Sequence, residues 1–269
     1  MTTTHTLAVP DAQLHYEVRG SGPLLLVMGA PMAAAYFAPV ADVLADDFTV
    51  VTHDPRGIAG SRLHDPEQDS TPELRADDVA ALLDALGAES ADVLGSSGGA
   101  ITGLALVERH PARVRTLVAH EPPVLELLPD AAEQRAAVDD MIETFHRDGL
   151  GAAWAKFMAS AGFDTDSEGA PTAPPGEPSE QDLADSARFF AHELRPTTRY
   201  VPDIAALTAA PARIVIGIGA ESGGLSTYRT STELARLLGT APVEFPGDHG
   251  GFLGQPVEFA EVLRKVLAG

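Results

Sequence analysis

The chain has 269 residues, 45% of them hydrophobic and 21% charged, which is typical of one large globular domain or two smaller ones. Its 18 basic and 39 acidic residues give a formal net charge of −21, which argues against nucleic acid and anionic membrane as partners. Cysteine is absent, so disulfides and thiolate chemistry are excluded. No apolar signal core or membrane-spanning run occurs, and we expect a cytoplasmic protein.

The first part of the chain alternates between predicted strands and helices. Two short strands at residues 6–9 and 14–18 form a hairpin, and the apolar run at 24–28 is typical of a strand buried on both faces. The following elements are a helix at 36–44, a strand at 48–52, a helix from Pro72, a strand at 91–94, a helix at 98–109 and a strand at 114–119. This alternation predicts a mostly parallel sheet flanked by helices.

A helical insertion interrupts this pattern. Residues 122–207 contain three helical stretches and no convincing strand. Within them, residues 164–182 are rich in proline and acidic residues and lack large aliphatic side chains, which predicts a mobile loop. The alternation then returns with two more strands, at 213–218 and 243–245, and a closing helix. We therefore predict a core at 1–121 and 208–269.

A glycine-framed serine links the strand at 91–94 to the next helix. Gly95, Ser97 and Gly99 match the pattern G-x-S-x-G, in which a sharp turn strains the serine backbone and leaves no room for neighbouring side chains. The turn places the hydroxyl at a helix N-terminus, where negative charge is favoured. The alternative is a glycine-rich turn that only reverses the chain or holds a phosphate. We predict Ser97 as a nucleophile.

His249 is the candidate general base, because a serine hydroxyl is protonated at neutral pH and needs a base to activate it. This histidine lies in a glycine-rich loop directly after the strand at 243–245, and open α/β sheets place their chemistry at such strand ends. The alternative is an ordinary histidine in a surface loop. No H-E-x-x-H or comparable spacing occurs, so we expect neither a metal nor a cofactor.

The chain resembles the α/β-hydrolase family over essentially its whole length. The resemblance rests on the G-x-S-x-G turn (the elbow), the histidine in a late loop and the helical insertion. The turn at 54–61 is also similar to a loop of that family. The resemblance implies an α/β-hydrolase fold with a helical cap, and a triad whose acid lies between serine and histidine in sequence. It also implies an oxyanion hole formed by the backbone N–H groups of Ala30 and Gly98. Met28 departs from the histidine of many members, which weakens this motif more than the mechanism.

Two residues are candidates for the acid of the triad. In most members of the family the acid follows the strand that corresponds to 213–218. At the usual spacing this chain has Ser222, which is not a carboxylate, and Glu221 lies one position before it. Glu121 instead follows the strand at 114–119 and precedes two prolines. A carboxylate partly buried at this position is tolerable only if it is paired, and an imidazolium is a suitable partner. We predict Glu121, with Glu221 as the alternative; Glu121 could otherwise cap the insertion or line the pocket.

The serine-serine-glycine elbow and the His120-Glu121-Pro122-Pro123 segment resemble those of zearalenone lactonases. Dehalogenases of this family use an aspartate nucleophile, so Ser97 excludes their reaction and disfavours that of epoxide hydrolases. The resemblance implies a serine hydrolase that opens a hydrophobic macrocyclic lactone through an acyl-enzyme. The alternatives are a generic carboxylesterase, a cofactor-independent peroxidase-like enzyme and a small-molecule receptor of the same fold.

The predicted cap should select the substrate, which we expect to be a small hydrophobic ester or lactone. Trp154, Met158 and Phe189 are large apolar residues of the cap that we expect at the pocket, although helix packing would give the same pattern. Tyr36, just beyond the oxyanion loop, is a further candidate, with helix packing as its alternative. The sequence leaves open whether the protein is a monomer or a homodimer.

Overall fold

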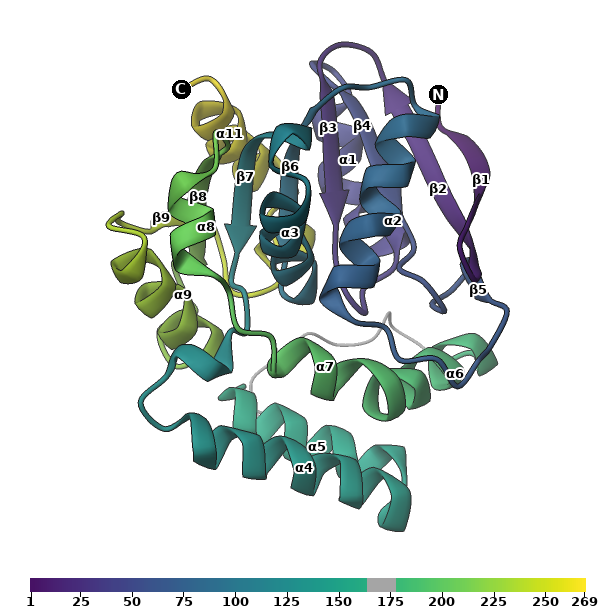
Figure 1. Ribbon diagram of the computed structural model, residues 1–269, viewed down its shortest axis with the longest axis vertical. Helices are drawn as coiled ribbons and strands as arrows, with labels where there is room; N and C mark the ends of the chain where they lie inside the picture. The colour runs from purple at the N-terminus through teal and green to yellow at the C-terminus, as the bar shows by residue number, and fades with distance from the viewer. Residues whose placement is uncertain (164–177) are drawn as a thin grey trace.

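A nine-stranded, mostly parallel sheet forms the centre of the molecule (Figure 1). The computed structural model describes residues 1–163 and 178–269. The strand order is β1-β2-β4-β3-β6-β7-β8-β9, and β5 pairs with β2. The strands are β1 (Thr3–Val9), β2 (Ala12–Gly20), β3 (Leu24–Met28), β4 (Thr49–His53), β5 (Arg62–Leu63), β6 (Ala91–Ser96), β7 (Val114–His120), β8 (Arg213–Gly219) and β9 (Val243–Phe245).

Helices cover both faces of this sheet, which confirms the predicted α/β-hydrolase architecture. Successive side chains of a strand point to opposite faces. In β3, Leu26 and Met28 pack in one cluster with α2 and α3, whereas Leu25 and Val27 pack in another with α1 and α11. The helices outside the insertion are η1 (Ala34–Phe37), α1 (Ala38–Leu44), α2 (Pro72–Ala85), α3 (Gly98–Arg109), η2 (Pro111–Arg113), α9 (Ser226–Leu237), α10 (Gly251–Gly254) and α11 (Pro256–Leu267).

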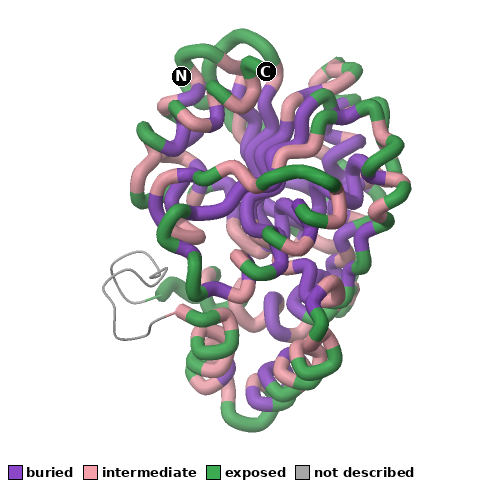
Figure 2. The backbone as a smooth tube through the Cα atoms, turned by 90° about the vertical axis from the view of Figure 1, so that its left-hand side faces the viewer, coloured by how far each residue is buried: buried purple, intermediate pink, exposed green. Residues whose placement is uncertain are grey.

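Local sequence signals account for the helices next to the site. The hydroxyl of Thr71 accepts a hydrogen bond from the N–H of Leu74, and Pro72 occupies the first turn, so α2 begins where the sequence predicts. Residues 98–107 of α3 are all buried, as expected of a helix that is apolar nearly all round. Figure 2 shows the buried residues gathered in the sheet and in the helix segments that face it.

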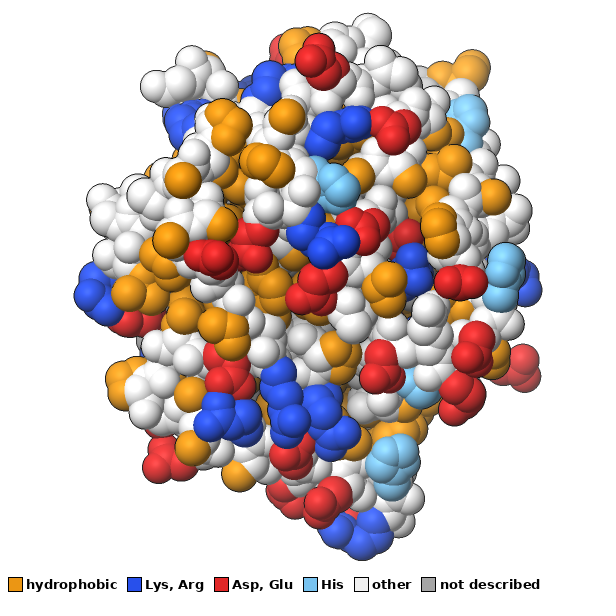
Figure 3. Space-filling model, viewed as in Figure 1, with side chains coloured by type: hydrophobic (Ala, Val, Ile, Leu, Met, Phe, Trp, Pro, Cys, Tyr) orange, Lys and Arg blue, Asp and Glu red, His pale blue; other side chains and the backbone are white. Residues whose placement is uncertain are grey.

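The insertion forms a helical layer across one end of the sheet (Figure 1). Arg195 and Arg199 both pair with Asp139 across two of its helices, and basic side chains gather over α4 and α7 in Figure 3. The helical segments of this part of the chain are η3 (Leu125–Leu127), α4 (Ala131–Asp148), α5 (Leu150–Ala161), α6 (Glu180–Arg188), the π-helical turn η4 (Phe189–Glu193), α7 (Leu194–Thr198) and α8 (Ile204–Ala209).

Two boundaries of the insertion differ from the simple sequence pattern. The loop predicted at 164–182 lies outside the described residues up to residue 177, but residues 180–182 are helical. Ser179 and Asp182 form a reciprocal capping box, which starts α6 earlier than the loop prediction allows. At the other end, Tyr200, Ile204 and Leu207 pack with the sheet cluster, because α8 runs beside the core rather than within the cap layer.

Candidate active site

The turn between β6 and α3 presents Ser97 on a strained backbone. Ser97 has φ of 56° and ψ of −125°, an uncommon conformation for a residue with a side chain. A Cβ on Gly95 would lie 2.4 Å from the carbonyl oxygen of Gly99, so the turn requires glycine there. Every other residue of the stretch 93–100 is buried, and Ser97 alone is partly accessible. The turn therefore offers one side chain of this stretch to a ligand.

Two backbone N–H groups lie free beside this turn. Gly98 begins α3, and a Cβ on it would lie 2.4 Å from the carbonyl oxygen of Ala30, so the two predicted oxyanion-hole residues are in close contact. Within residues 1–163 and 178–269, neither the N–H of Ala30 nor that of Gly98 has a hydrogen-bond acceptor. Free N–H groups at a helix N-terminus favour a bound negative charge.

Glu121 and the partly buried His249 form a hydrogen-bonded pair although they are 128 positions apart in the sequence. The Nδ1 atom of His249 lies 2.5 Å from Oε2 of Glu121, whose side chain is fully buried. The N–H of Gly219 donates to Oε1 at 2.8 Å, and the hydroxyl of Thr227 donates to Oε2 at 2.9 Å. Burial disfavours the charged carboxylate, but the hydrogen bond and charge of His249, with smaller contributions from His120 and Ser222, outweigh it and lower the pKa of Glu121 to about 2. The carboxylate is therefore ionised at neutral pH.

The alternative acid lies elsewhere. Glu221 is exposed, and its backbone N–H donates to the carbonyl of Gly247. Ser222, at the position where the family spacing lands, is fully buried near the Glu121 carboxylate. The structure thus brings Glu121, and not Glu221, to His249.

His120 lies beneath the pair and is a residue that the sequence analysis cited only as part of a motif. Its carbonyl accepts the N–H of Ser97 at 2.9 Å, and its ring stacks on that of His249 with centroids 6.3 Å apart. Its Nδ1 atom lies 3.1 Å from the hydroxyl of Ser96. Burial lowers the pKa of His120 to about 4, so this ring is neutral at neutral pH. In the sequence, the one feature that could have indicated a role for His120 is its place directly before the predicted acid, Glu121.

The aromatic residues of the cap divide into two groups. Trp154 and Phe189 stack on each other with centroids 5.5 Å apart and belong to the hydrophobic cluster within the cap itself. Phe163, which was not among the substrate-binding candidates, forms a T-shaped pair with the ring of His249, with centroids 6.0 Å apart. Met158, in α5, is partly exposed, and its carbonyl accepts the N–H of Phe163. The cap residue that contacts His249 is therefore Phe163, whereas Trp154 packs within the cap.

Tyr36 lies where the core meets the cap. Its side chain is half-buried, and burial together with the negative charges of Asp182 and Asp185 raises its pKa. Because Asp182 and Asp185 belong to α6, this tyrosine lies beside the cap helix rather than within the sheet. Its ring also packs against the hydrophobic cluster that contains α1 and α11, as the helix-packing alternative predicts.

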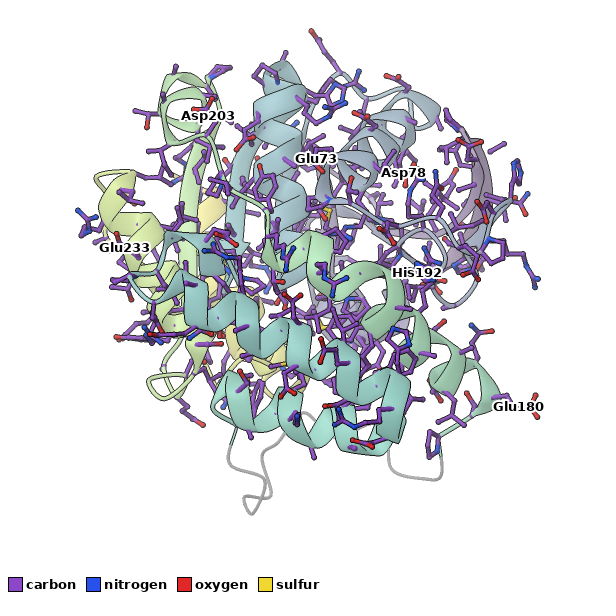
Figure 4. The ribbon with its side chains drawn as sticks, turned by 60° about the horizontal axis from the view of Figure 1, so that its bottom comes forward. Glu73, Asp78, Glu180, His192, Asp203 and Glu233 are labelled. Carbon is purple, nitrogen blue, oxygen red and sulfur yellow. The ribbon has the colours of Figure 1, made fainter. Side chains whose placement is uncertain are left out.

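A polar junction ties the cap to α2. The guanidinium of Arg75 is buried and donates to the hydroxyls of Thr102 in α3 and Thr197 in α7, both at 3.0 Å. Glu193, 1% exposed, lies 3.6 Å from Nε of Arg188, and among the described residues neither of its carboxylate oxygens has a hydrogen-bond partner. Burial raises the pKa of Glu193 to about 7, against the opposing charges of both arginines. In Figure 4, the label His192 marks the helical run that contains Glu193, and the label Asp78 marks α2.

Comparison with known proteins identifies the family. A family model described as alpha/beta hydrolase fold matches residues 22–205. The chain belongs to the α/β hydrolases. This α/β hydrolase is 36% identical over 268 residues to an uncharacterized hydrolase, YraK, of Bacillus subtilis, covering 97% of this chain and 95% of that protein. The matched family region includes Ala30, Ser97 and Glu121, whereas His249 lies beyond it.

Two further relatives of this hydrolase are informative. A zearalenone hydrolase of Bionectria ochroleuca is 32% identical over 145 residues, which cover 52% of this chain and 54% of that protein. The solved structure of a thermophilic esterase from Thermogutta terrifontis matches with a TM-score of 0.75 at 21% identity, covering 100% of this chain and 98% of that one, and shows the shared fold. No helix of the described residues is long and apolar enough to cross a membrane. These residues also contain no cluster of three or more histidine or acidic side chains that could hold a metal ion.

Proposed function

We propose that this hydrolase cleaves a hydrophobic carboxylic ester, and specifically opens a macrocyclic lactone of the zearalenone type. The observation that carries the proposal is the Glu121–His249 hydrogen bond together with the strained, partly accessible Ser97, which His120 links to His249. The partial identity to a zearalenone hydrolase supports the choice of lactone.

In the proposed reaction, Ser97 Oγ attacks the ester carbonyl while Nε2 of His249 takes its proton. Glu121 holds Nδ1–H of the ring and stabilises the imidazolium that forms, without itself becoming protonated. The N–H groups of Ala30 and Gly98 donate to the oxyanion of the tetrahedral intermediate. His249 then protonates the departing alkoxide, and in a lactone this alcohol stays attached to the acyl chain.

Water completes the cycle. His249 removes a proton from a water molecule, the resulting hydroxide attacks the acyl-enzyme, and the proton returns to Ser97 as the acid leaves. In a substrate-free site, the hydrogen bond between nucleophile and base is often long and tightens only with substrate. Phe163, whose ring forms a T-shaped pair with that of His249, would limit the access of bulk water to the base.

The test is to incubate the purified protein with zearalenone and follow ring opening by chromatography, with 4-nitrophenyl esters assayed in parallel. We expect ring opening by the wild type and its loss in Ser97→Ala. Hydrolysis of aryl esters without ring opening would instead indicate a general carboxylesterase. Binding of zearalenone without turnover of either substrate would indicate a receptor and overturn the hydrolase mechanism.

The matched pair Glu121→Gln and Glu221→Gln tests the acid. Both changes remove one negative charge, but only Glu121 contacts His249. We expect Glu121→Gln to lower kcat about 10³–10⁴-fold, because the wrong imidazole tautomer is then favoured, and Glu221→Gln to leave kcat unchanged. The reverse result would assign the acid to Glu221. Labelling by a fluorophosphonate, located by mass spectrometry, should mark the peptide with Ser97 and be lost in Ser97→Ala.

A further inference from the structure

Besides His249 and Gly219, the Glu121 carboxylate has a third hydrogen-bond donor, the hydroxyl of Thr227. Oε1 accepts the N–H of Gly219, while Oε2 accepts both Nδ1–H of His249 and the hydroxyl of Thr227. An ionised carboxylate only accepts hydrogen bonds, so the single hydrogen of the Thr227 hydroxyl points at Oε2. Thr227 therefore acts on the same oxygen atom that orients the histidine ring.

Two threonines of α9 make hydrogen bonds to the segment Glu121–Pro122, but only Thr227 contacts the Glu121 carboxylate. Thr227 bonds to the side chain of Glu121, and one turn later the hydroxyl of Thr230 donates to the carbonyl of Pro122 at 2.7 Å. Both threonines are buried, with exposed fractions of 8% and 0%. Glu121 itself has φ of 50°, a conformation that a residue with a side chain adopts only when its surroundings impose it. The helix supplies those surroundings from a segment more than 100 residues away in sequence.

Without the Thr227 hydroxyl, the carboxylate would keep Gly219 on one oxygen and His249 on the other. Among the described residues, the hydrogen bond from His249, whose loop is itself glycine-rich, would then be the one that holds Oε2, with the buried Ser222 hydroxyl nearby but not bonded to it. The carboxylate would thus lose part of the geometry that selects one imidazole tautomer. A hydrogen bond to a charged group is worth enough for its loss to change a rate by about 10–100-fold.

We propose that Thr227 is a positioning residue that fixes the Glu121 carboxylate against His249, and through it the orientation of the proposed base. The inference rests on the proposed Ser97–His249–Glu121 function. It assigns to α9 a part in the reaction, although no atom of this helix is proposed to touch the substrate.

The test compares Thr227→Val, which keeps the shape and removes the hydroxyl, with Thr227→Ser, which restores the hydroxyl. We expect Thr227→Val to lower kcat for an aryl ester about 10–100-fold with little change in KM, and Thr227→Ser to recover it to within about threefold. In a proton NMR spectrum, the low-field signal of the His249 Nδ1–H should shift or broaden in Thr227→Val and return in Thr227→Ser.

Thr230→Val is the matched control, because it removes a buried hydroxyl from the same helix without touching the carboxylate. We expect it to lower Tm while kcat and the low-field signal stay close to wild type. Equal losses of kcat in Thr227→Val and Thr230→Val, with an unchanged low-field signal, would show a merely structural role and overturn the inference.

The outcomes also separate the inference from the proposed function. If Ser97→Ala and Glu121→Gln are inactive but Thr227→Val has the kcat and the low-field signal of the wild type, the triad stands and the role of Thr227 is wrong. If Ser97→Ala keeps wild-type activity, the proposed function is wrong, and the inference falls with it.

Discussion

Replacing Glu193 with glutamine should make the protein more stable, and increasingly so as the pH rises. Burial raises the pKa of this carboxyl group from its ordinary value of 4.5 to about 7. Below pH 4.5 the group is protonated in both the folded and the unfolded chain. Between pH 4.5 and 7 the unfolded chain releases the proton while the folded chain keeps it, so the stability of the wild type falls as the pH rises.

The magnitude follows from the size of the shift. A rise of about 2.5 pKa units corresponds to about 3 kcal/mol of stability, fully lost once the pH exceeds the folded pKa. Glutamine resembles the protonated carboxyl group in shape and does not titrate. The free energy of unfolding of Glu193→Gln should therefore exceed that of the wild type, by a margin that grows about 2 kcal/mol from pH 5.5 to pH 8.

Urea denaturation of both proteins at pH 5.5, 7 and 8 measures this margin, and these values stay above the sequence pI of about 4.6. Glu143→Gln, on an exposed position of α4, is the matched control and should differ from wild type by less than about 0.5 kcal/mol at every pH. A margin that is constant with pH, or a Glu193→Gln variant less stable than wild type at pH 8, would refute the reasoning. It would mean that the two arginines at the junction hold the carboxylate ionised.

Three further changes test other parts of the structure. Gly98→Ala places a Cβ 2.4 Å from the Ala30 carbonyl oxygen, so kcat should fall about 100-fold with an unchanged circular dichroism spectrum; full activity would remove this residue from the proposed oxyanion hole. Arg56→Lys breaks the two buried hydrogen bonds from the guanidinium to Asp78, at 2.6 and 2.7 Å. In urea titrations it should lower the free energy of unfolding by about 2–4 kcal/mol. An unchanged midpoint would show that the two-point geometry does not matter for stability. Trp154→Ala should cost about 2–4 kcal/mol through lost cap packing, measured by the same titration; a raised KM at unchanged stability would instead place the indole in the substrate pocket.

Much of the fold follows from local sequence. The apolar run of β3 predicts a strand buried on both faces, and its alternate side chains do pack in two separate clusters. Gly98–Arg109 and Val243–Phe245 begin and end where the sequence predicts. The serine turn could be predicted because its G-x-S-x-G pattern lies within five residues, where Gly95 makes room for the carbonyl of Gly99. Gly99 makes room for the distant carbonyl of Met28, a contact that only the structure shows. The two-residue strand β5 was missed, since its pairing with β2 carries no periodic signal.

Other features depend on which segments meet in space. The cap aromatics illustrate this: Trp154 has the same sequence pattern whether it packs the cap or lines a pocket, and only the contacts of the folded chain place it against Phe189. Phe163 gave no periodic signal, yet it lies at His249. In the sequence Glu193 is one acidic residue among many, and only the docking of the cap on the core buries it near Arg75 of α2.

By itself, the sequence determined the class of fold, the serine turn and the loop that carries the histidine, because each is encoded by residues next to one another. It left two carboxylates as candidates for the acid. Tertiary structure decided which of them contacts His249: β7 and β8 are neighbours in the sheet, with His120 opposite Gly217, so Glu121 reaches the N–H of Gly219 and the ring of His249. The order of the strands and their register determine the distance between Glu121 and His249, and no short stretch of the sequence encodes either of them.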